Sequence, residues 1–282
     1  MDAMRLVKKS GLNFKVEDRS PAADTSIADD RREKLGHYLG GMLYYGGEWY
    51  WGLDRLHFLE DRLMKMGLRH SGNGTKFIYE QPNVPVGSGK TGAELHWYAS
   101  FRSPYTAIVA DRVKVLADAY GADLKVRMVL PMVMRGLPVP KSKRTYIPLD
   151  TAREARRLQI PYGRIFDPVG KPVERGYSLL PWARDQGKDY DFSHAFLTCV
   201  WSEGTDPGSD SGMRKVVERA GLDWNEAKHI VGNDEWRAEA EANREEMMER
   251  GIWGVPSFRV GDIITWGQDR LWVIERALQK LT

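Results

Sequence analysis

The chain contains one cysteine, Cys199, among its 282 residues. A single thiol cannot form an intramolecular disulfide, and its presence alone excludes a Cys-x-x-Cys redox pair. The formal net charge is only +3 at pH 7, so the composition does not indicate a nucleic-acid partner. No apolar run approaches the roughly 18 residues that a membrane-spanning helix needs. These absences exclude dithiol exchange, and we expect no contact with nucleic acid or membrane.

Other signals are also weak or missing. Residues 1–5 do not begin the apolar core of a signal peptide, so we expect a cytoplasmic location. The six histidines show no metal-ligand spacing, and no metal site is predicted. Residues 86–91 resemble a phosphate loop, but a Walker A motif needs glycine where the chain has Val84, so we expect no nucleotide binding.

Composition divides the chain into four parts. Residues 1–28 are polar without a period and predict a flexible leader. Residues 29–68 predict a hairpin and an amphipathic helix, and residues 69–92, with five glycines and two prolines, predict a linker. The remaining part, residues 93–282, is long enough for a domain with its own core.

An internal repeat links the second part to the end of the chain. A shift of 215 residues aligns identical residues, namely Gly36, Gly46, Trp51, Gly52, Asp54, Arg55, Leu56, Glu60 and Leu63, with residues 251, 261, 266, 267, 269, 270, 271, 275 and 278. The first copy predicts only a hairpin and a helix, which bury too little to be stable alone. We therefore expect residues 29–68 to be a partial repeat that docks on the larger domain or on another subunit.

The larger domain has alternating strand and helix signals. Short apolar strands precede and follow a helix that begins at Ser103-Pro104, and a proline loop, a Gly-Asp turn and an amphipathic helix close the chain. The expected order is strand, helix, strand, helical insertion, hairpin and helix, at residues 96–99, 103–119, 124–130, about 132–250, 255–267 and 271–278. This order predicts the α/β class and a thioredoxin-like fold with an α-helical insertion, preceded by the partial repeat.

Ser103 lies where a strand turns into a helix. Serine is favoured at the N-cap and proline at the first helical position, so Ser103-Pro104 is typical of an ordinary capped helix. The same hydroxyl at the positive end of a helix could also stabilise a ligand thiolate and lower the pKa of its thiol. Redox members of such a fold carry cysteines where this chain has Ser103 and Thr106. Both interpretations remain open from the sequence.

Two further segments surround the closing hairpin. Val255-Pro256 is typical of a cis-proline loop, whose backbone either only shapes the chain or pairs with an extended peptide. Gln268-Asp269 opens the last helix, where Asp269 either complements the helix dipole or receives the amino group of a ligand. The first copy keeps Asp54 but has Leu53 in place of Gln268, so Gln268 discriminates better between these roles.

Together, Ser103-Pro104-Tyr105, Gly254-Val255-Pro256 and the segment 266–271 (Trp-Gly-Gln-Asp-Arg-Leu) resemble the 2-hydroxychromene-2-carboxylate isomerase family over residues 94–282. That family is related to kappa-class glutathione transferases and to DsbA-type oxidoreductases. The resemblance implies that Ser103 activates glutathione, that Val255 pairs with its cysteinyl backbone and that Gln268-Asp269 holds its γ-glutamyl end. The chain departs from the family in one place, because Ser100 stands where an aspartate is usual.

The resemblance therefore implies a glutathione-dependent isomerase or transferase, with glutathione as the cofactor and an aromatic or conjugated small molecule as the substrate. The family's own pocket residues find no match in residues 132–144, so the candidate pocket residues come from this sequence itself. They are Tyr105, Met132, Lys141, Lys143 and Arg144, and a solvated loop also explains the three basic residues. We expect a homo-oligomer, in the form of a dimer. The alternative is a catalytically silent scaffold, for which the aromatic residues of the first hairpin suit an interface.

Overall fold

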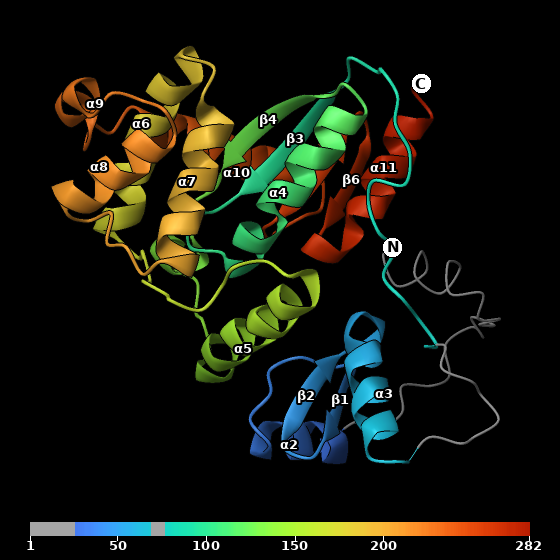
Figure 1. Ribbon diagram of the computed structural model, residues 1–282. Helices are drawn as coiled ribbons and strands as arrows, with labels where there is room; N and C mark the ends of the chain where they lie inside the picture. Colours follow the sequence, from blue (N-terminus) through green and yellow to red (C-terminus); the bar gives the residue numbers. More distant parts are fainter. Residues whose placement is uncertain (1–25, 69–76) are drawn as a thin grey trace. The chain divides into compact units, whose positions relative to one another are not determined.

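A computed structural model describes residues 26–68 and 77–282 of the chain (Figure 1). Two compact units share these residues. The first contains the chain up to Pro82 together with residues 140–146, and the second contains residues 83–139 and 147–282. The predicted leader lies outside the described residues up to position 25, as do residues 69–76 of the predicted linker.

The second unit is built on a four-stranded sheet in the order β4-β3-β5-β6. Strand β3 (Glu94–Ala99) pairs in parallel with β4 (Asp123–Met128) and antiparallel with β5 (Ser257–Val260). The last strand, β6 (Ile263–Trp266), forms a hairpin with β5. A parallel pair needs a crossover, and α4 (Pro104–Ala119) supplies it between β3 and β4. This topology is the thioredoxin-like arrangement that the sequence predicts.

Helices fill the insertion and complete the unit. Between β4 and β5 the chain forms η3 (Met132–Arg135), α5 (Lys141–Leu158), α6 (Lys171–Asp185), α7 (Asp189–Ser202), α8 (Asp210–Arg219), α9 (Trp224–Ile230) and α10 (Trp236–Glu249). After β6 the chain forms η4 (Gln268–Arg270) and α11 (Leu271–Gln279). The helical insertion is therefore confirmed. Among the described residues, no helix is long and apolar enough to cross a membrane.

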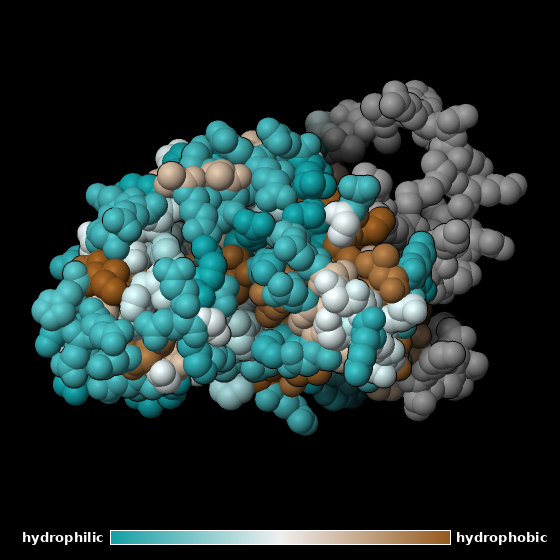
Figure 2. All heavy atoms as spheres, turned by 90° about the horizontal axis from the view of Figure 1, so that it is seen from above, coloured by the Kyte–Doolittle hydropathy of each residue, from teal (hydrophilic) through white to brown (hydrophobic). Residues whose placement is uncertain are grey.

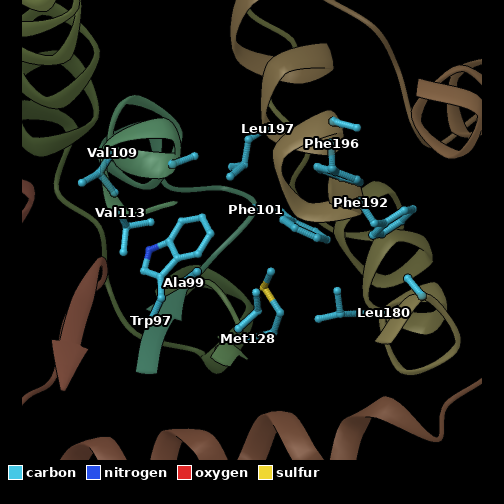
Figure 3. Close-up of a cluster of buried hydrophobic side chains, with 14 of the residues drawn as sticks. Trp97, Ala99, Phe101, Val109, Val113, Met128, Leu180, Phe192, Phe196 and Leu197 are labelled. Atoms are coloured by element: carbon cyan, nitrogen blue, oxygen red, sulfur yellow. The ribbon is translucent and has the colours of Figure 1, made fainter. Parts of the chain in front are cut away.

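The two faces of the sheet carry different cores. Leu95, Trp97 and Ala99 alternate along β3 and are fully buried with side chains of α4, α7 and α11. Figure 3 shows this cluster, with Trp97 beside α4 and Phe101 facing Phe196 of α7. The other face packs a small group around Tyr98 and Met247 of α10. The period of two along β3 thus fixes which helices cover each face.

The surface is consistent with this burial. On the face drawn in Figure 2, hydrophilic side chains predominate and hydrophobic side chains form small, separate patches. Cys199 is buried in α7, and burial raises the pKa of its thiol.

Part of the predicted linker is packed against the second unit. The carboxylate of Glu275 accepts hydrogen bonds from the backbone amides of Val86 (2.6 Å) and Gly87 (3.1 Å). The amide of Gly89 donates to the carbonyl of Ala119 at 2.9 Å. A Cβ on Gly87 would lie 2.7 Å from the hydroxyl of Tyr120. The linker interpretation is therefore wrong for residues 83–92, whose glycines permit close packing.

The first unit contains α2 (Ser26–Lys34), the hairpin β1 (Met42–Tyr45) and β2 (Glu48–Trp51), η1 (Leu53–Arg55) and α3 (Leu56–Lys65). The elements β1, β2, η1 and α3 repeat the order of β5, β6, η4 and α11. Arg55 and Arg270 are both buried, and each donates to the carbonyl of the aspartate before it. The hairpin and helix of the partial repeat therefore recur in structure as well as in sequence.

Gly176 gives a test of packing in the second unit. A Cβ at this position of α6 would lie 2.6 Å from Phe196 and 2.8 Å from Phe101. Gly176→Ala should lower the free energy of unfolding by about 1–3 kcal/mol, because overpacking outweighs the helix propensity that alanine gains. Urea denaturation measures the change, with exposed Lys171→Ala as the control. A stabilised Gly176→Ala protein would contradict the packing described here.

His96 gives a test that depends on pH. Its ring is buried, contacts Glu94 and Arg127, and is also influenced by Arg259 and Glu246. Burial, followed by the two arginines, holds the pKa of His96 below the ordinary value of 6.5. A lowered histidine pKa contributes stability above that ordinary value, and the contribution is lost as the pH falls through the folded-state pKa.

The free energy of unfolding should therefore fall more steeply below pH 6.5 in the wild type than in His96→Gln, which has no titrating ring at this position. Denaturant titrations at several pH values measure both slopes, and the difference is at most about 1.4 kcal/mol per pH unit. Parallel curves for the two proteins would show that His96 is not destabilised by protonation.

Candidate functional site

The pairing of β3 with β5 brings distant segments to one edge of the sheet. Tyr98, near the end of β3, is paired with Ser257 at the start of β5. The loop that follows β3 and the loop that precedes β5 therefore leave the sheet at the same edge. Ser103 lies on the first of these loops, and Val255-Pro256 lies on the second.

The closing hairpin adds a third segment to this edge. Trp266, at the end of β6, is paired with Ser257. The amide of Gly267 then donates to the carbonyl of Pro256 at 2.9 Å. Gln268 and Asp269 follow directly in η4. The topology thus places all of the predicted glutathione-contacting segments at one edge of the sheet, which we call the site edge.

Ser103 is the N-cap of α4, which has 16 residues. Its Oγ accepts a hydrogen bond from the backbone amide of Thr106 at 3.2 Å, and Pro104 occupies the first turn. The cap interpretation is confirmed. Within residues 26–68 and 77–282, the hydroxyl of Ser103 donates to no group, so its proton is available to a ligand at the positive end of the helix.

Thr106 occupies the other position of the motif, one turn further into α4. Its side chain is fully buried, and its hydroxyl has no hydrogen-bond partner among the described residues. In redox members of the fold these two positions carry cysteines. In this chain they carry the half-buried Ser103, whose hydroxyl proton is available to a ligand, and the buried hydroxyl of Thr106.

Val255 lies two residues before β5, and the Val255–Pro256 peptide bond is cis. In the part of the chain that the structure describes, neither the amide nor the carbonyl of Val255 makes a hydrogen bond. Pro256 is buried behind it. An unpaired backbone at the edge of a sheet can pair with an extended ligand chain.

Gln268 is buried, with 1% of its surface exposed. Its Oε1 accepts a hydrogen bond from Nη1 of Arg112 at 2.6 Å, and its Nε2 donates to Glu154 at 3.1 Å and to the adjacent Asp269. The side chain of Gln268 is therefore engaged by internal partners. A side-chain contact between Gln268 and glutathione does not fit this arrangement, and Asp269 is the better candidate for that contact.

The sequence analysis did not predict the two residues that form hydrogen bonds with the Gln268 side chain, Arg112 and Glu154. Arg112 lies on the third turn of α4, and Glu154 lies on α5 with a side chain that is 0% exposed. Glu154 also pairs with Arg157 at 2.8 Å. Loss of water around the guanidinium lowers the pKa of Arg112, while Asp269 and Glu154 oppose that shift. A charge inside an otherwise apolar helix face was the available signal for Arg112.

Tyr105, predicted to line a substrate pocket, is held by a second carboxylate of α5. Its hydroxyl donates to Oδ2 of Asp150 at 2.7 Å, and Arg153 donates to Oδ1 at 2.7 Å. Asp150 is 1% exposed. Asp150 and Glu154 are one helical turn apart, so one face of α5 supplies carboxylates to both the start of α4 and η4.

The other predicted pocket residues are divided between the units. Met132 begins η3, which follows the end of β4 and so leaves the sheet at the site edge. Lys141, Lys143 and Arg144 lie in residues 140–146, which belong to the first unit. There Lys143 lies 5.8 Å from the ring centre of Tyr38. The role of these three basic residues in a substrate pocket stays a prediction.

Ser100 replaces the aspartate that is usual in the resembling family. It is buried, and its hydroxyl oxygen lies 3.4 Å from that of Tyr177. Tyr177 donates its one O–H proton to the carbonyl of Val129 at 2.8 Å, and burial raises the pKa of Tyr177 strongly. The position thus holds a neutral hydroxyl where a carboxylate is expected. Among the residues that the structure describes, no group of His, Cys, Asp and Glu side chains could hold a metal ion.

A comparison with family models finds a match to the DSBA-like thioredoxin domain over residues 94–279. The chain belongs to this family. The matched residues begin with β3 and end with α11, so they contain the whole sheet and the helical insertion. The partial repeat lies before the matched part.

Relatives and solved structures point in the same direction. The chain is 24% identical over 193 residues to a 2-hydroxychromene-2-carboxylate isomerase of Pseudomonas putida, covering 66% of this chain and 94% of that protein. An isomerase of the same name from Sphingobium xenophagum is 26% identical over 193 residues, covering 65% and 97%.

A solved 2-hydroxychromene-2-carboxylate isomerase superposes with a TM-score of 0.55 at 24% identity, covering 66% of this chain and 95% of that chain. The cytosolic disulfide reductase DsbM of Pseudomonas aeruginosa superposes with a TM-score of 0.52 at 16% identity, covering 67% and 100%. These superpositions confirm the fold.

Tyr105→Phe tests the support that α5 gives to the start of α4. The change leaves the buried carboxylate of Asp150 without one donor, so the free energy of unfolding should fall by about 1.5–3 kcal/mol. The control is Tyr190→Phe, which removes a hydrogen bond to the neutral carbonyl of Ala110 and should cost about 0.5–1.5 kcal/mol. Equal costs in denaturant titrations would show that the Tyr105 hydroxyl does not stabilise a buried charge.

Proposed function

We propose that the chain is a glutathione-dependent isomerase of the 2-hydroxychromene-2-carboxylate isomerase type that acts on an aromatic or conjugated small molecule. The observation that carries the proposal is the meeting, at one sheet edge, of the Ser103 hydroxyl at a helix N-terminus with the unpaired backbone of Val255. The named relatives, which match almost their whole length to this chain, support the isomerase class.

The residues at the site edge fit glutathione. The backbone of Val255 offers one donor and one acceptor to the cysteinyl part of a tripeptide. Asp269, at the start of η4, offers a carboxylate to the ammonium of the γ-glutamyl part. Bound in this way, glutathione supplies a thiolate that can add to an activated carbon and later leave it.

Ser103 has the central chemical task in this proposal. Its hydroxyl donates a hydrogen bond to the ligand sulfur while the dipole of α4 favours negative charge at the same point. Lowering a thiol pKa from about 8.5 to about 6.5 stabilises the thiolate by roughly 2.7 kcal/mol. A charge-assisted hydrogen bond together with a partly buried helix dipole is sufficient for that. Tyr105 and Met132, near the same edge, would contact the substrate.

Thermal unfolding with reduced glutathione tests this proposal. At a hundred times the dissociation constant, binding should stabilise the fold by about 2.7 kcal/mol, which raises the midpoint by several degrees. The ultraviolet band of the thiolate, read in the same samples near neutral pH, should appear in the wild type and be lost in Ser103→Ala.

Ser209→Ala is the matched control, because Ser209 caps α8 in the same way, accepting from Gly212 at 3.1 Å. Both variants should lose about 1 kcal/mol of stability through the missing cap, but only Ser103→Ala should lose the thiolate band. No thermal shift with the wild type would overturn the glutathione site and favour the scaffold alternative. A thiolate band that survives in Ser103→Ala would remove the role given to Ser103.

A further inference from the structure

The hydrogen bonds around Gln268 fix the orientation of its side-chain amide. Arg112 can only donate hydrogen bonds, so its contact with Gln268 requires the amide oxygen. Glu154, when ionised, can only accept, so its contact requires the amide nitrogen. The two charged side chains therefore fix which end of the Gln268 amide faces each of them.

The orientation of the Gln268 amide also determines which of its atoms faces the carboxylate of Asp269. The Nε2 group of Gln268 donates to Oδ1 of Asp269. If the amide were reversed, its oxygen would face the carboxylates of Asp269 and Glu154, which repel it. The 2.6 Å contact from Arg112 to Oε1 opposes that reversal.

We propose that Arg112 is a positioning residue of the glutathione site, acting through Gln268 to hold the carboxylate of Asp269 in the orientation that receives the γ-glutamyl ammonium. This inference rests on the proposed function and deepens it. Ser103 and Arg112 lie on the same helix, so α4 positions the thiol end of the ligand through its first turn and the amino end through its third turn.

Charged side chains of both signs surround Gln268. Glu154 is fully buried, and it is paired with Arg157 at 2.8 Å as well as with Gln268. A buried carboxylate with several donors is stable, whereas removal of one partner leaves it poorly compensated. Arg112 supplies the positive charge on the opposite side of Gln268, where Asp269 is its main favourable neighbour.

The test compares two thiols that differ in the group attached to the cysteine nitrogen. Reduced glutathione carries there the γ-glutamyl group, with the ammonium that Asp269 is proposed to receive, and N-acetylcysteinylglycine keeps the amide but lacks that ammonium. Calorimetric titration of the full chain with each thiol gives an affinity ratio. In Arg112→Met the ratio should fall about tenfold, which corresponds to one charge-assisted hydrogen bond.

Four further variants separate positioning from general stability. Arg112→Lys keeps the charge and should restore most of the ratio, whereas Asp269→Asn should lower it as much as Arg112→Met does. The double variant should then show little further loss, because both changes remove the same contact. Arg175→Met is the control, since Arg175 pairs with Asp210 on other elements of the same unit, and it should leave the ratio unchanged.

If Arg112→Met does not fold, Glu154→Gln tests the same amide from its other side and should also lower the ratio. A ratio that stays at the wild-type value in folded Arg112→Met or Glu154→Gln would overturn the role of Arg112 while leaving the glutathione proposal intact. Failure of the wild type to bind either thiol would overturn the proposed function and this inference with it.

Discussion

The antiparallel pairing of β3 with β5 is the constraint on which the candidate site depends. The register that joins Tyr98 to Ser257 brings residues 159 positions apart to one edge of the sheet. A slip of one residue would turn Trp97 away from the core that it shares with α4. The large buried area of Trp97 and its neighbours thus stabilises the register, and the register brings the loops that carry Ser103 and Val255-Pro256 to the same edge of the sheet.

A second layer of interactions supports this edge from α5. Its buried carboxylates Asp150 and Glu154 reach the first turn of α4 and the start of η4, respectively. Each is compensated by an arginine on the same helix. Buried charges stabilise only when all of their partners are present, and they restrict side-chain orientation strongly. We infer that α5 holds the site edge in one geometry.

Local sequence patterns predict much of the fold, but they do not predict the contacts that the buried carboxylates of α5 make with α4 and η4. Ser103-Pro104 predicts the start of a helix, and Gly261 predicts the turn of the closing hairpin, because each signal depends on neighbouring residues alone. Pro148 lies inside α5 (Lys141–Leu158), and because proline is unfavourable inside a helix, the sequence pattern does not reveal the first turns of this helix. Arg112 and Gln268 are 156 positions apart, and no local period reports such a pair. For the same reason the packing of residues 83–92 against Glu275 was missed.

The central claim is that one ligand contacts the start of α4, the Val255 loop and η4 together. A two-dimensional amide NMR titration of the full chain with reduced glutathione tests it most directly. The account predicts that the amides of Ser103, Tyr105, Thr106, Val255 and Asp269 shift together with one dissociation constant. Shifts confined to another region, such as the groove lined by Tyr177 and Trp236, or an unchanged spectrum would contradict it.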